Sequence, residues 1–214
     1  RRGLALVRTQ EELRDAVLAA LRASRNGLCL VEELAHGPEV TVTGFSWRGR
    51  FQPLTVMDRL PLAHVWPSHH GEDAAELAEE AVRALGIEEG PSTTQLRLTP
   101  EGPRVVEVGA RLGGGHDPEL CETALGVDLH GLALSAALGE EIEPARVAAG
   151  PRVAGACVYF IAGGPGEPEG LERAVAAPGV EWARVYPGSD RRGAVLATGL
   201  TREQALEWAA RAAE

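Results

Sequence analysis

Short segments between residues 39 and 111 place apolar and polar residues at alternate positions, the pattern of half-buried strands. They are residues 39–49, 50–59, 93–99 and 103–111. A turn near Gly49 joins the first two, which predicts a hairpin. Two apolar segments precede them. Gly3–Val7 is predicted to form a short strand, and Leu28–Glu33 a buried strand.

Other segments repeat their apolar side chains with a helical period. Thr9 and Glu12 form a capping box at the start of the first predicted helix. Residues 72–86 predict a second helix with Leu77, Ala81 and Leu85 on its inner face. The segment between the hairpin and this helix, residues 61–71, is rich in His and Pro and is predicted to be a loop.

The last third of the chain predicts a smaller α/β lobe, beginning near residue 151 after a linker. Strands are predicted at residues 152–162, 180–186 and 193–200, and helices at 168–176 and 201–213. The whole chain is therefore assigned to the α/β (α+β) class, with an antiparallel-rich sheet flanked by helices.

Composition narrows the functional classes. The net charge of −10 and the lack of a basic stripe argue against nucleic acid as a partner. No apolar run approaches the roughly 18 residues that span a bilayer, so we expect no membrane partner and a cytoplasmic location. The three cysteines, Cys29, Cys121 and Cys157, are odd in number and widely spaced, which predicts buried thiols. All 21 basic side chains are Arg, so no mechanism can use a lysine of this chain.

The hairpin at residues 93–111 brings two oxygen-bearing side chains together. With residues 100–102 as a three-residue loop, Gln95 lies opposite Glu107 and Arg97 opposite Val105. Arg111 follows four residues after Glu107. Because Mg²⁺ accepts a few protein oxygens together with phosphate oxygens, this group suits a Mg²⁺–phosphate complex. The alternatives are a surface ion pair and a glycine loop that only turns a corner.

These residues belong to an ordered series that resembles the second half of an ATP-grasp carboxylate-amine ligase. The series comprises "LCLVEELAHGPEVTVTGFSWRGR", "MDR", "TPEGPRVVEVGARLGGG" and "ALGVDLHGLALSAALG". The tail "GVEWARVYPGSDRRGAVLATGLTREQAL" is similar to the C-terminal lobe of the L-amino acid ligase branch. The resemblance implies a remnant of the small lobe at 1–33, a large lobe with the metal and ATP site at 34–145, and a C-terminal lobe at 151–214.

The resemblance also implies roles for single residues in binding ATP and Mg²⁺. Glu33 and Leu34 match the hinge that contacts adenine through its backbone, and Glu39 matches the acid that binds the ribose. Glu107 matches a Mg²⁺ ligand, and Gln95 stands where another acidic ligand is usual.

On the substrate side, Arg111 matches the arginine that steadies the phosphoryl group or acyl phosphate. Backbone amides of residues 113–115, with Gly114 at their centre, would stabilise the oxyanion when an amine attacks. His64 and His116 are candidates to line the acceptor side, as are His69 and His70; each is also compatible with a solvated loop histidine.

The chain departs from the family pattern at two positions. Gly109 stands where the family has Asn, and Gln95 is neutral, so the metal site has fewer ligands and less negative charge. The segment "RRGLALV" resembles the end of the region that follows the phosphate-binding loop. We therefore expect the first domain and its ATP-binding lysines to precede Arg1, and this portion alone not to ligate.

The leading hypothesis is the C-terminal part of an ATP- and Mg²⁺-dependent ligase that joins a small carboxylate to an amine through an acyl phosphate. The expected partners are these small molecules, and a homodimer stays open. Two alternatives remain: a catalytically silent ATP-grasp-like module that binds a nucleotide or a protein, and an enzyme of the biotin carboxylase kind.

Overall fold

The computed structural model describes residues 3–148, 150–163, 170–186 and 191–214. The chain divides into two units, Arg1–Ala35 and His36–Glu214, and each is described here by itself. Neither unit has, within these described ranges, a helix long and apolar enough to cross a membrane.

The first unit is built around one helix, α1 (Gln10–Ala23). The predicted cap is confirmed: Thr9 Oγ1 accepts the N–H of Glu12 at 3.4 Å. The carboxylate of Glu12 reaches back to the N–H of Arg8 at 2.9 Å. The helix therefore begins where side chains satisfy N–H groups that have no partner inside the helix.

The two strands predicted in this unit are wrong. Gly3–Val7 and Leu28–Glu33 have no strand pairing, and Leu28 and Leu30 are 72% and 81% exposed. A strand needs a neighbour for its N–H and C=O groups, and no described segment of the unit supplies one. Apolar composition alone is therefore not enough to form a strand. Cys29, expected to be a buried thiol, is partly exposed for the same reason.

The second unit contains an eight-stranded sheet in the order β5-β4-β1-β2-β3-β6-β8-β7. Every neighbouring pair is antiparallel. The strands are β1 (Glu39–Trp47), β2 (Arg50–Leu60), β3 (Ala63–Trp66), β4 (Gly90–Thr99), β5 (Gly102–Gly109), β6 (Gly155–Ile161), β7 (Val180–Val185) and β8 (Gly193–Gly199). The predicted mixed α/β class with an antiparallel sheet is confirmed.

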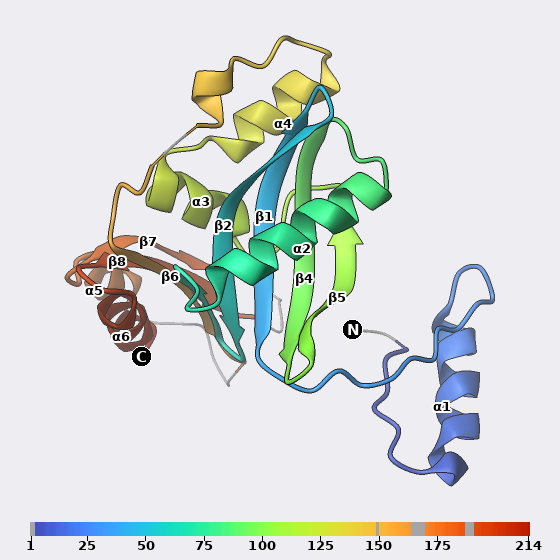
Figure 1. The fold of residues 1–214 in the computed structure, drawn as a ribbon. Coiled ribbons are helices and arrows are strands. Elements are labelled where there is room, and N and C mark those ends of the chain that lie inside the picture. The colour runs from blue at the N-terminus through green and yellow to red at the C-terminus, as the bar shows by residue number, and fades with distance from the viewer. Residues whose placement is uncertain (1–2, 149, 164–169, 187–190) are drawn as a thin grey trace. The chain divides into compact units, whose positions relative to one another are not determined.

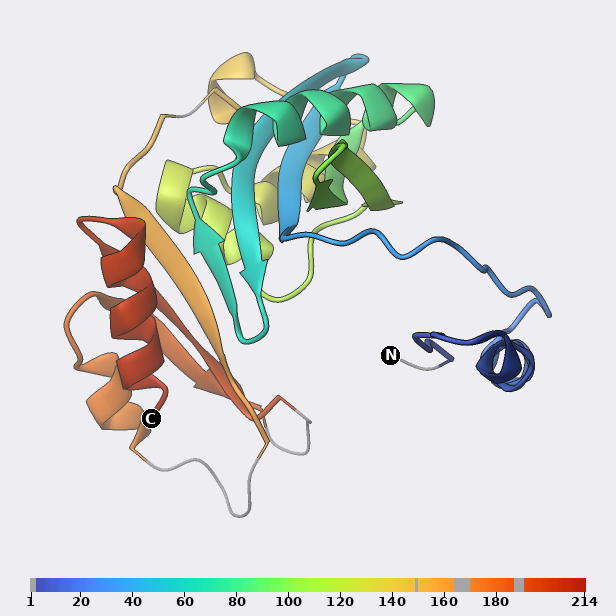
Figure 2. The same cartoon turned by 60° about the horizontal axis from the view of Figure 1, so that its bottom comes forward.

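In the described part of this unit, five α-helices pack against the sheet or beside it. They are α2 (Gly71–Ala84), α3 (Asp117–Leu125), α4 (Leu129–Ala137), α5 (Leu171–Val175) and α6 (Arg202–Ala212), with a short 3₁₀ turn at Pro144–Arg146. Figures 1 and 2 show α2 on one face of the β1–β2–β4 part of the sheet and α3 and α4 on the other. The helix predicted at residues 201–213 is confirmed as α6, and its first turn is capped by Thr201, whose Oγ1 accepts the N–H of Gln204 at 3.1 Å.

The register of the sheet decides what each face carries. Residues directly opposed on antiparallel strands point to the same face, so one row crosses five strands: Val40, Asp58, Val65, Cys157 and Ala197. The first of these side chains packs against alanines of α2, and the last three pack against alanines of α6. Both helices therefore cover the same face.

The opposite face is divided into an apolar part and a polar part. The apolar part packs under α3 and α4 through side chains that include Phe45, Met57, Val158 and Leu196, with Leu120 of α3 among them. The polar part lies on β1, β2, β4 and β5 and holds charged residues at the strand ends. The predicted residues Glu39, Gln95 and Glu107 lie on this polar part.

Two sequence predictions change in this unit. Residues 61–71 were predicted to be a loop, but Ala63–Trp66 forms β3, with all four residues buried between β2 and β6. The strand is too short, and too closely flanked by prolines, for a period to show. The buried residues of α2 are Ala74, Ala78 and Val82; of the predicted inner face, Leu77 packs beside them, whereas Leu85 is exposed.

A core substitution tests this architecture. Leu120 is fully buried under α3, whereas Leu134 on α4 is 61% exposed. We expect Leu120→Ala to lower the free energy of unfolding by about 2 to 5 kcal/mol, because a cavity replaces packed methyl groups. Leu134→Ala should change it by less than about 0.5 kcal/mol. Urea unfolding of both variants measures the difference, and equal losses would contradict the assigned core.

Candidate functional site

The site begins with a row of polar side chains that crosses four strands. Arg97 of β4 lies opposite Glu39 of β1, Glu39 opposite Arg59 of β2, and Arg59 opposite His64 of β3. Both carboxylate oxygens of Glu39 are engaged. Oε1 lies 3.1 Å from Arg59 Nε, and Oε2 lies 2.9 Å from an Arg97 terminal nitrogen. The acid predicted to bind ribose is therefore held between two guanidinium groups.

The predicted pairing of Gln95 with Glu107 is confirmed, but the hairpin reaches it by a different route. Thr99 pairs with Gly102, so the loop has two residues rather than the predicted three, and Arg97 faces Arg104 rather than Val105. A bulge between Gln95 and Leu96 then restores the register. The shorter loop shifts the strand pairing by one residue, and the bulge shifts it back by one residue.

Arg111 turns back toward Glu107, one of the two predicted metal ligands. Its terminal nitrogen lies 3.1 Å from Glu107 Oε1, and its other terminal nitrogen donates to the carbonyl of Leu112 at 3.0 Å. Both side chains of the ion pair are about half exposed, so this contact contributes little stability by itself. The ion pair does fix a position, because it holds beside a carboxylate a guanidinium that lines a cavity.

This cavity, which we call the arginine cavity, has a volume of about 170 Å³. The predicted residues Gln95, Arg111 and Gly114 line it together. The complete lining is Arg59, Thr93, Gln95, Arg111, Gly114, Gly115, Asp117 and Arg191. The structure thus brings the metal, phosphoryl and glycine-loop candidates to one place.

A buried pair of side chains lies beside the arginine cavity. His64 Nδ1 lies 2.6 Å from Asp117 Oδ1, and the two side chains are only 3% and 1% exposed. Among the described residues, Asp117 Oδ2 is buried without a hydrogen-bond partner. A buried carboxylate oxygen without a donor is costly, which is typical of groups kept for binding or chemistry.

The glycine loop has no room for side chains at its end. Gly115 has φ +72°, and a Cβ atom there would lie 2.8 Å from His64 Cε1 and 3.0 Å from Phe160 Cζ. Both the backbone conformation and the space therefore require glycine. The backbone of the loop can approach a ligand because nothing protrudes from it.

His116, the next residue, is tied to the C-terminal strands rather than directed into the arginine cavity. Its Nδ1 lies 2.8 Å from Glu119 Oε1, and its Nε2 forms a short hydrogen bond with the Tyr186 hydroxyl. Arg184 holds the same oxygen of Glu119 at 3.2 Å and stacks over Trp182. We call these five side chains the loop anchor.

The electrostatics of the loop anchor follow from these contacts. Burial alone would raise the pKa of Glu119, but the hydrogen bond from His116 and nearby positive charge hold it below its ordinary value. Burial raises the pKa of the Tyr186 hydroxyl, with Arg184 opposing that change.

Elsewhere, burial raises the pKa of Cys121 and of Cys157 to about 12, so both are inert thiols at neutral pH.

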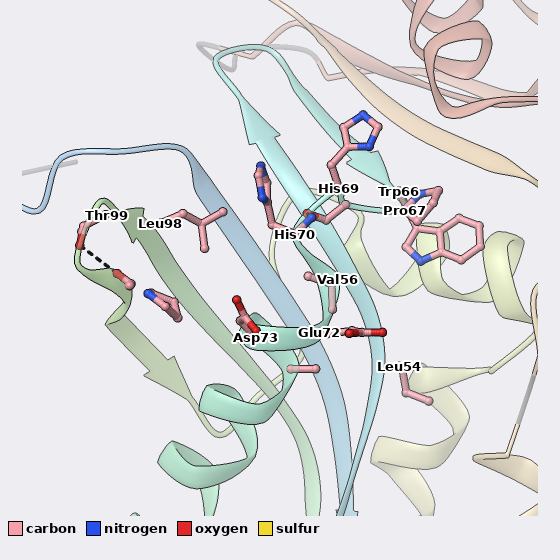
Figure 3. Close-up of a pocket in the computed structure, with 15 residues that line it drawn as sticks. Leu54, Val56, Trp66, Pro67, His69, His70, Glu72, Asp73, Leu98 and Thr99 are labelled. Carbon is pink, nitrogen blue, oxygen red and sulfur yellow. Dashed lines mark hydrogen bonds between the residues drawn. The ribbon is translucent and has the colours of Figure 1, made fainter.

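A second and larger hollow of about 800 Å³ lies at the start of α2, and Figure 3 shows it. Its apolar side chains include Leu54, Val56 and Leu98. The predicted acceptor residues His69 and His70 line this hollow and not the arginine cavity. In Figure 3, His70 and Asp73 point into the space beside Leu98 and Thr99.

The remaining predicted residues, Glu33 and Leu34, belong to the first unit, where they are exposed and outside any strand. Residues that the sequence analysis missed are Arg59, Asp117 and Arg191. Arg59 had a usable signal, because a hairpin with its turn near Gly49 places it opposite Glu39. Arg191 had none, since no local pattern connects it to the glycine loop.

The predicted metal site can be tested against these side chains. Among the described residues, no group of three or more His, Cys, Asp or Glu side chains could hold a metal ion by itself. Glu107 and Gln95 offer one carboxylate and one amide oxygen, a set that suits Mg²⁺ only when phosphate and water oxygens complete its shell. The residues therefore fit Mg²⁺ bound together with a nucleotide, not a resident metal.

Comparisons with known proteins identify the fold. No family model matches the chain. A protein of Sinorhizobium fredii called y4rH is 30% identical over 228 residues, which cover 95% of this chain and 48% of that protein. Dapdiamide A synthase of Enterobacter agglomerans is 27% identical over 126 residues, covering 52% of this chain and 30% of the synthase. The chain thus spans about half or less of the curated relatives that it matches.

Solved structures match over nearly the whole chain. L-amino acid ligase from Bacillus licheniformis has a TM-score of 0.79 and 23% identity, covering 96% of this chain and 59% of the ligase. N5-carboxyaminoimidazole synthase from Aspergillus clavatus, in complex with ADP, gives 0.75 and 16%, covering 97% and 58%. Biotin carboxylase from Campylobacter jejuni gives 0.72 and 16%, covering 96% and 52%. These neighbours are ATP-grasp enzymes, and the predicted ATP-grasp fold is confirmed.

The lowered pKa of Glu119 makes the stability of the loop anchor depend on pH. A carboxyl group with a lowered folded-state pKa stabilises the fold above its unfolded pKa and loses this contribution as pH falls through the folded value. We expect Glu119→Gln to lower the free energy of unfolding by about 1 kcal/mol near neutral pH, allowing for solvent screening. This difference from the parent should vanish below about pH 3.

Chemical unfolding across this pH range, followed by the fluorescence of the tryptophans, measures the effect. Glu122→Gln on the exposed side of the same helix is the matched control and should show no such pH dependence. If Glu119→Gln lowered the free energy of unfolding by the same amount at every pH down to 3, the ionised form of Glu119 would not be what stabilises the loop anchor.

Proposed function

We propose that this chain binds ATP and the acid substrate in a ligase that joins a small carboxylate to an amine, with the ATP-grasp fold as the premise. The observation that carries the proposal is the arginine cavity. Gln95, which pairs with Glu107 across β4 and β5, lines it together with the guanidinium of Arg111 and the side-chain-free Gly114 and Gly115. The activity belongs to the whole protein, of which this chain matches about half in its relatives.

The residues divide the chemical task between them. Arg111 would bind the transferred phosphoryl group, since a guanidinium offers paired donors to phosphate oxygens. The N–H groups of the glycine loop would donate to the acyl oxygen as negative charge develops on it during attack by the amine. Mg²⁺ with ATP would neutralise phosphate charge, and Glu107 and Gln95 are the residues that would hold it.

The buried pair of His64 and Asp117 would act on the amine side of the reaction. An attacking ammonium must lose a proton before its nitrogen becomes a nucleophile. His64 is an imidazole held in one direction by Asp117 at 2.6 Å, and Asp117 lines the arginine cavity. His116 would contribute by holding the end of the glycine loop through the loop anchor.

A second candidate is a nucleotide-binding module without ligase activity. Two residues favour it. Gln95 is neutral, so the proposed metal site has one negative charge fewer than a pair of acids would give. Gly109, two residues beyond Glu107, has no side chain that could act as a ligand. Binding of ADP without phosphate release would identify it. A carboxylase like the biotin-dependent neighbour would instead release phosphate in response to bicarbonate.

The experiment is phosphate release from ATP and Mg²⁺ by the full natural protein, measured with pools of amino acids, small acids and small amines. We expect release only when an acid and an amine are both present. Binding of ADP, measured by calorimetry, separates a silent module from a misfolded sample. Failure of every pool to raise phosphate release, with ADP binding intact, would refute the ligase.

One substitution tests whether Arg111 takes part in the proposed reaction. Arg111→Gln should lower kcat about 10²-fold or more, because a preorganised charge at the phosphoryl group is lost. Arg83→Gln makes the same change on α2, which covers the other sheet face, and should leave the rate unchanged. Steady-state phosphate release measures both variants, and equal rates would remove Arg111 from the site.

A further inference from the structure

Positive charge is concentrated on the polar face of the sheet, in a chain whose net charge is −10. The row that contains Glu39 extends to β5, where Arg104 lies opposite Arg97. In the neighbouring row, Glu107 pairs with Arg111. Together these two rows and Arg111 hold four guanidinium groups and two carboxylates, which belong to Arg59, Arg97, Arg104, Arg111, Glu39 and Glu107. Such an excess of fixed positive charge is typical of an anion-binding surface.

Arg59 carries part of this charge into the arginine cavity, which it lines together with Arg111. Glu39 shares its carboxylate between Arg59 and Arg97, so these three side chains together keep one positive charge. The side chains of Arg59 and Glu39 are both only 17% exposed. Water and salt therefore screen this charge less than they would on the open surface.

The guanidinium of Arg59 reaches the strand position beside the predicted metal ligands. Its Nη1 donates to Thr41 Oγ1 at 3.4 Å, and Thr41 of β1 lies directly opposite Gln95 of β4. Gln95 in turn lies opposite Glu107 of β5. Directly opposed side chains on antiparallel strands are neighbours. A guanidinium therefore stands on one side of Gln95 and a carboxylate on the other.

The contacts of Arg59 fix its direction and leave donors for a ligand. A guanidinium has five N–H donors in one plane. The ion pair with Glu39 involves Nε at 3.1 Å, and the hydrogen bond to Thr41 comes from Nη1. Neither contact uses Nη2. The two terminal nitrogens can therefore donate together to two oxygens of one phosphoryl group.

Carboxylates on this face are too few to balance phosphate charge through several metal ions. Glu107 is the one carboxylate of the predicted metal pair and is shared with Arg111, and Gln95 is neutral. In the described ranges, no group of three His, Cys, Asp or Glu side chains could hold a metal ion by itself. Guanidinium groups are present whether or not Mg²⁺ is bound, so they can balance much of the phosphate charge without it.

We propose that Arg59 is a phosphate-binding residue of the nucleotide site and that ADP binding at this site depends only weakly on Mg²⁺. This inference rests on the nucleotide binding in the proposed function, to which it adds a residue and a metal requirement. Arg111 binds phosphate from the side of the glycine loop, and Arg59 binds it from the side of β1 and β2. The neutral Gln95 fits between them, because an acid at that position would pair with Arg59 and cancel its charge.

The test measures ADP binding by the full natural protein with calorimetry, once with excess Mg²⁺ and once with EDTA. The parent should bind ADP less than about 10-fold more weakly in EDTA. Arg59→Gln should weaken binding in EDTA by about 10- to 100-fold, the effect of losing a charge-assisted hydrogen bond. With Mg²⁺ the loss should stay below about 3-fold, because the ion balances the same phosphate charge.

A matched control separates phosphate binding from the loss of an ion pair. Arg97 lies 2.9 Å from the same carboxylate of Glu39 but outside the lining of the arginine cavity. Arg97→Gln should change ADP affinity by less than about 3-fold in either buffer. Arg59→Lys should keep part of the affinity in EDTA, because its charge remains but its paired donors are lost.

Three results for Arg59→Gln would overturn the proposal. They are an affinity in EDTA equal to that of the parent, equal losses in the two buffers, and a loss that Arg97→Gln reproduces. The first would show that Arg59 does not bind phosphate, and the other two would show that its role is structural.

A second variant leaves Arg59 in place, and it decides the question even if Arg59→Gln does not fold. Gln95→Glu puts a carboxylate opposite Thr41, where the guanidinium of Arg59 lies. ADP binding should then weaken about 10-fold in EDTA and recover with Mg²⁺. An unchanged affinity in EDTA would show that ADP does not use the charge of Arg59.

These outcomes are separate from those of the ligase proposal. If no acid and amine raise phosphate release, the ligase is refuted and the ADP result still stands. If the parent loses ADP binding in EDTA, or binds no ADP in either buffer, the role of Arg59 is refuted. Phosphate release then judges the ligase by itself.

Discussion

The register of one antiparallel sheet is the constraint on which the candidate site depends. Because opposed residues share a face, a single row carries Arg97, Glu39, Arg59 and His64 across four strands. The same row continues into Val158 and Leu196, which pack under α3. A slip of one residue in any pairing would move the charged side chains of that strand to the face that α2 and α6 cover and its apolar side chains to the polar face. The packing of the apolar residues in this row therefore determines the face on which its charged residues lie.

Local patterns predicted the parts of this sheet that carry their own register. The hairpin of β4 and β5 placed Gln95 opposite Glu107 from turn chemistry and alternation alone. The loop is nevertheless one residue shorter than predicted, and a bulge compensates for it. Such compensation leaves no mark in a local pattern, because a bulge is stabilised by the whole ladder rather than by its own residues.

Other parts depended on contacts that no local pattern contains. The segment Leu28–Glu33 has the composition of a strand but no pairing partner in the described part of its unit. The strand β3 is so short that its place between β2 and β6 decides its conformation. Arg191 belongs to the arginine cavity only because β6 and β8 pair along seven residues. Tertiary context, not propensity, determines all three.

The glycine loop shows how one rigid framework positions a segment that has no side chains of its own. At its end, Gly115 fits between His64 and Phe160 with no space for a Cβ atom. Directly after it, His116 is held by Glu119 of α3 and by Tyr186 beyond β7. Strands from the middle and from the end of the chain thus fix the same loop. The Phe160 ring also lies under the Arg191 guanidinium and receives the edge of the His64 ring, so one aromatic side chain packs against the glycine loop and against two side chains beside it. A change in Phe160 would therefore shift the loop and His64 together.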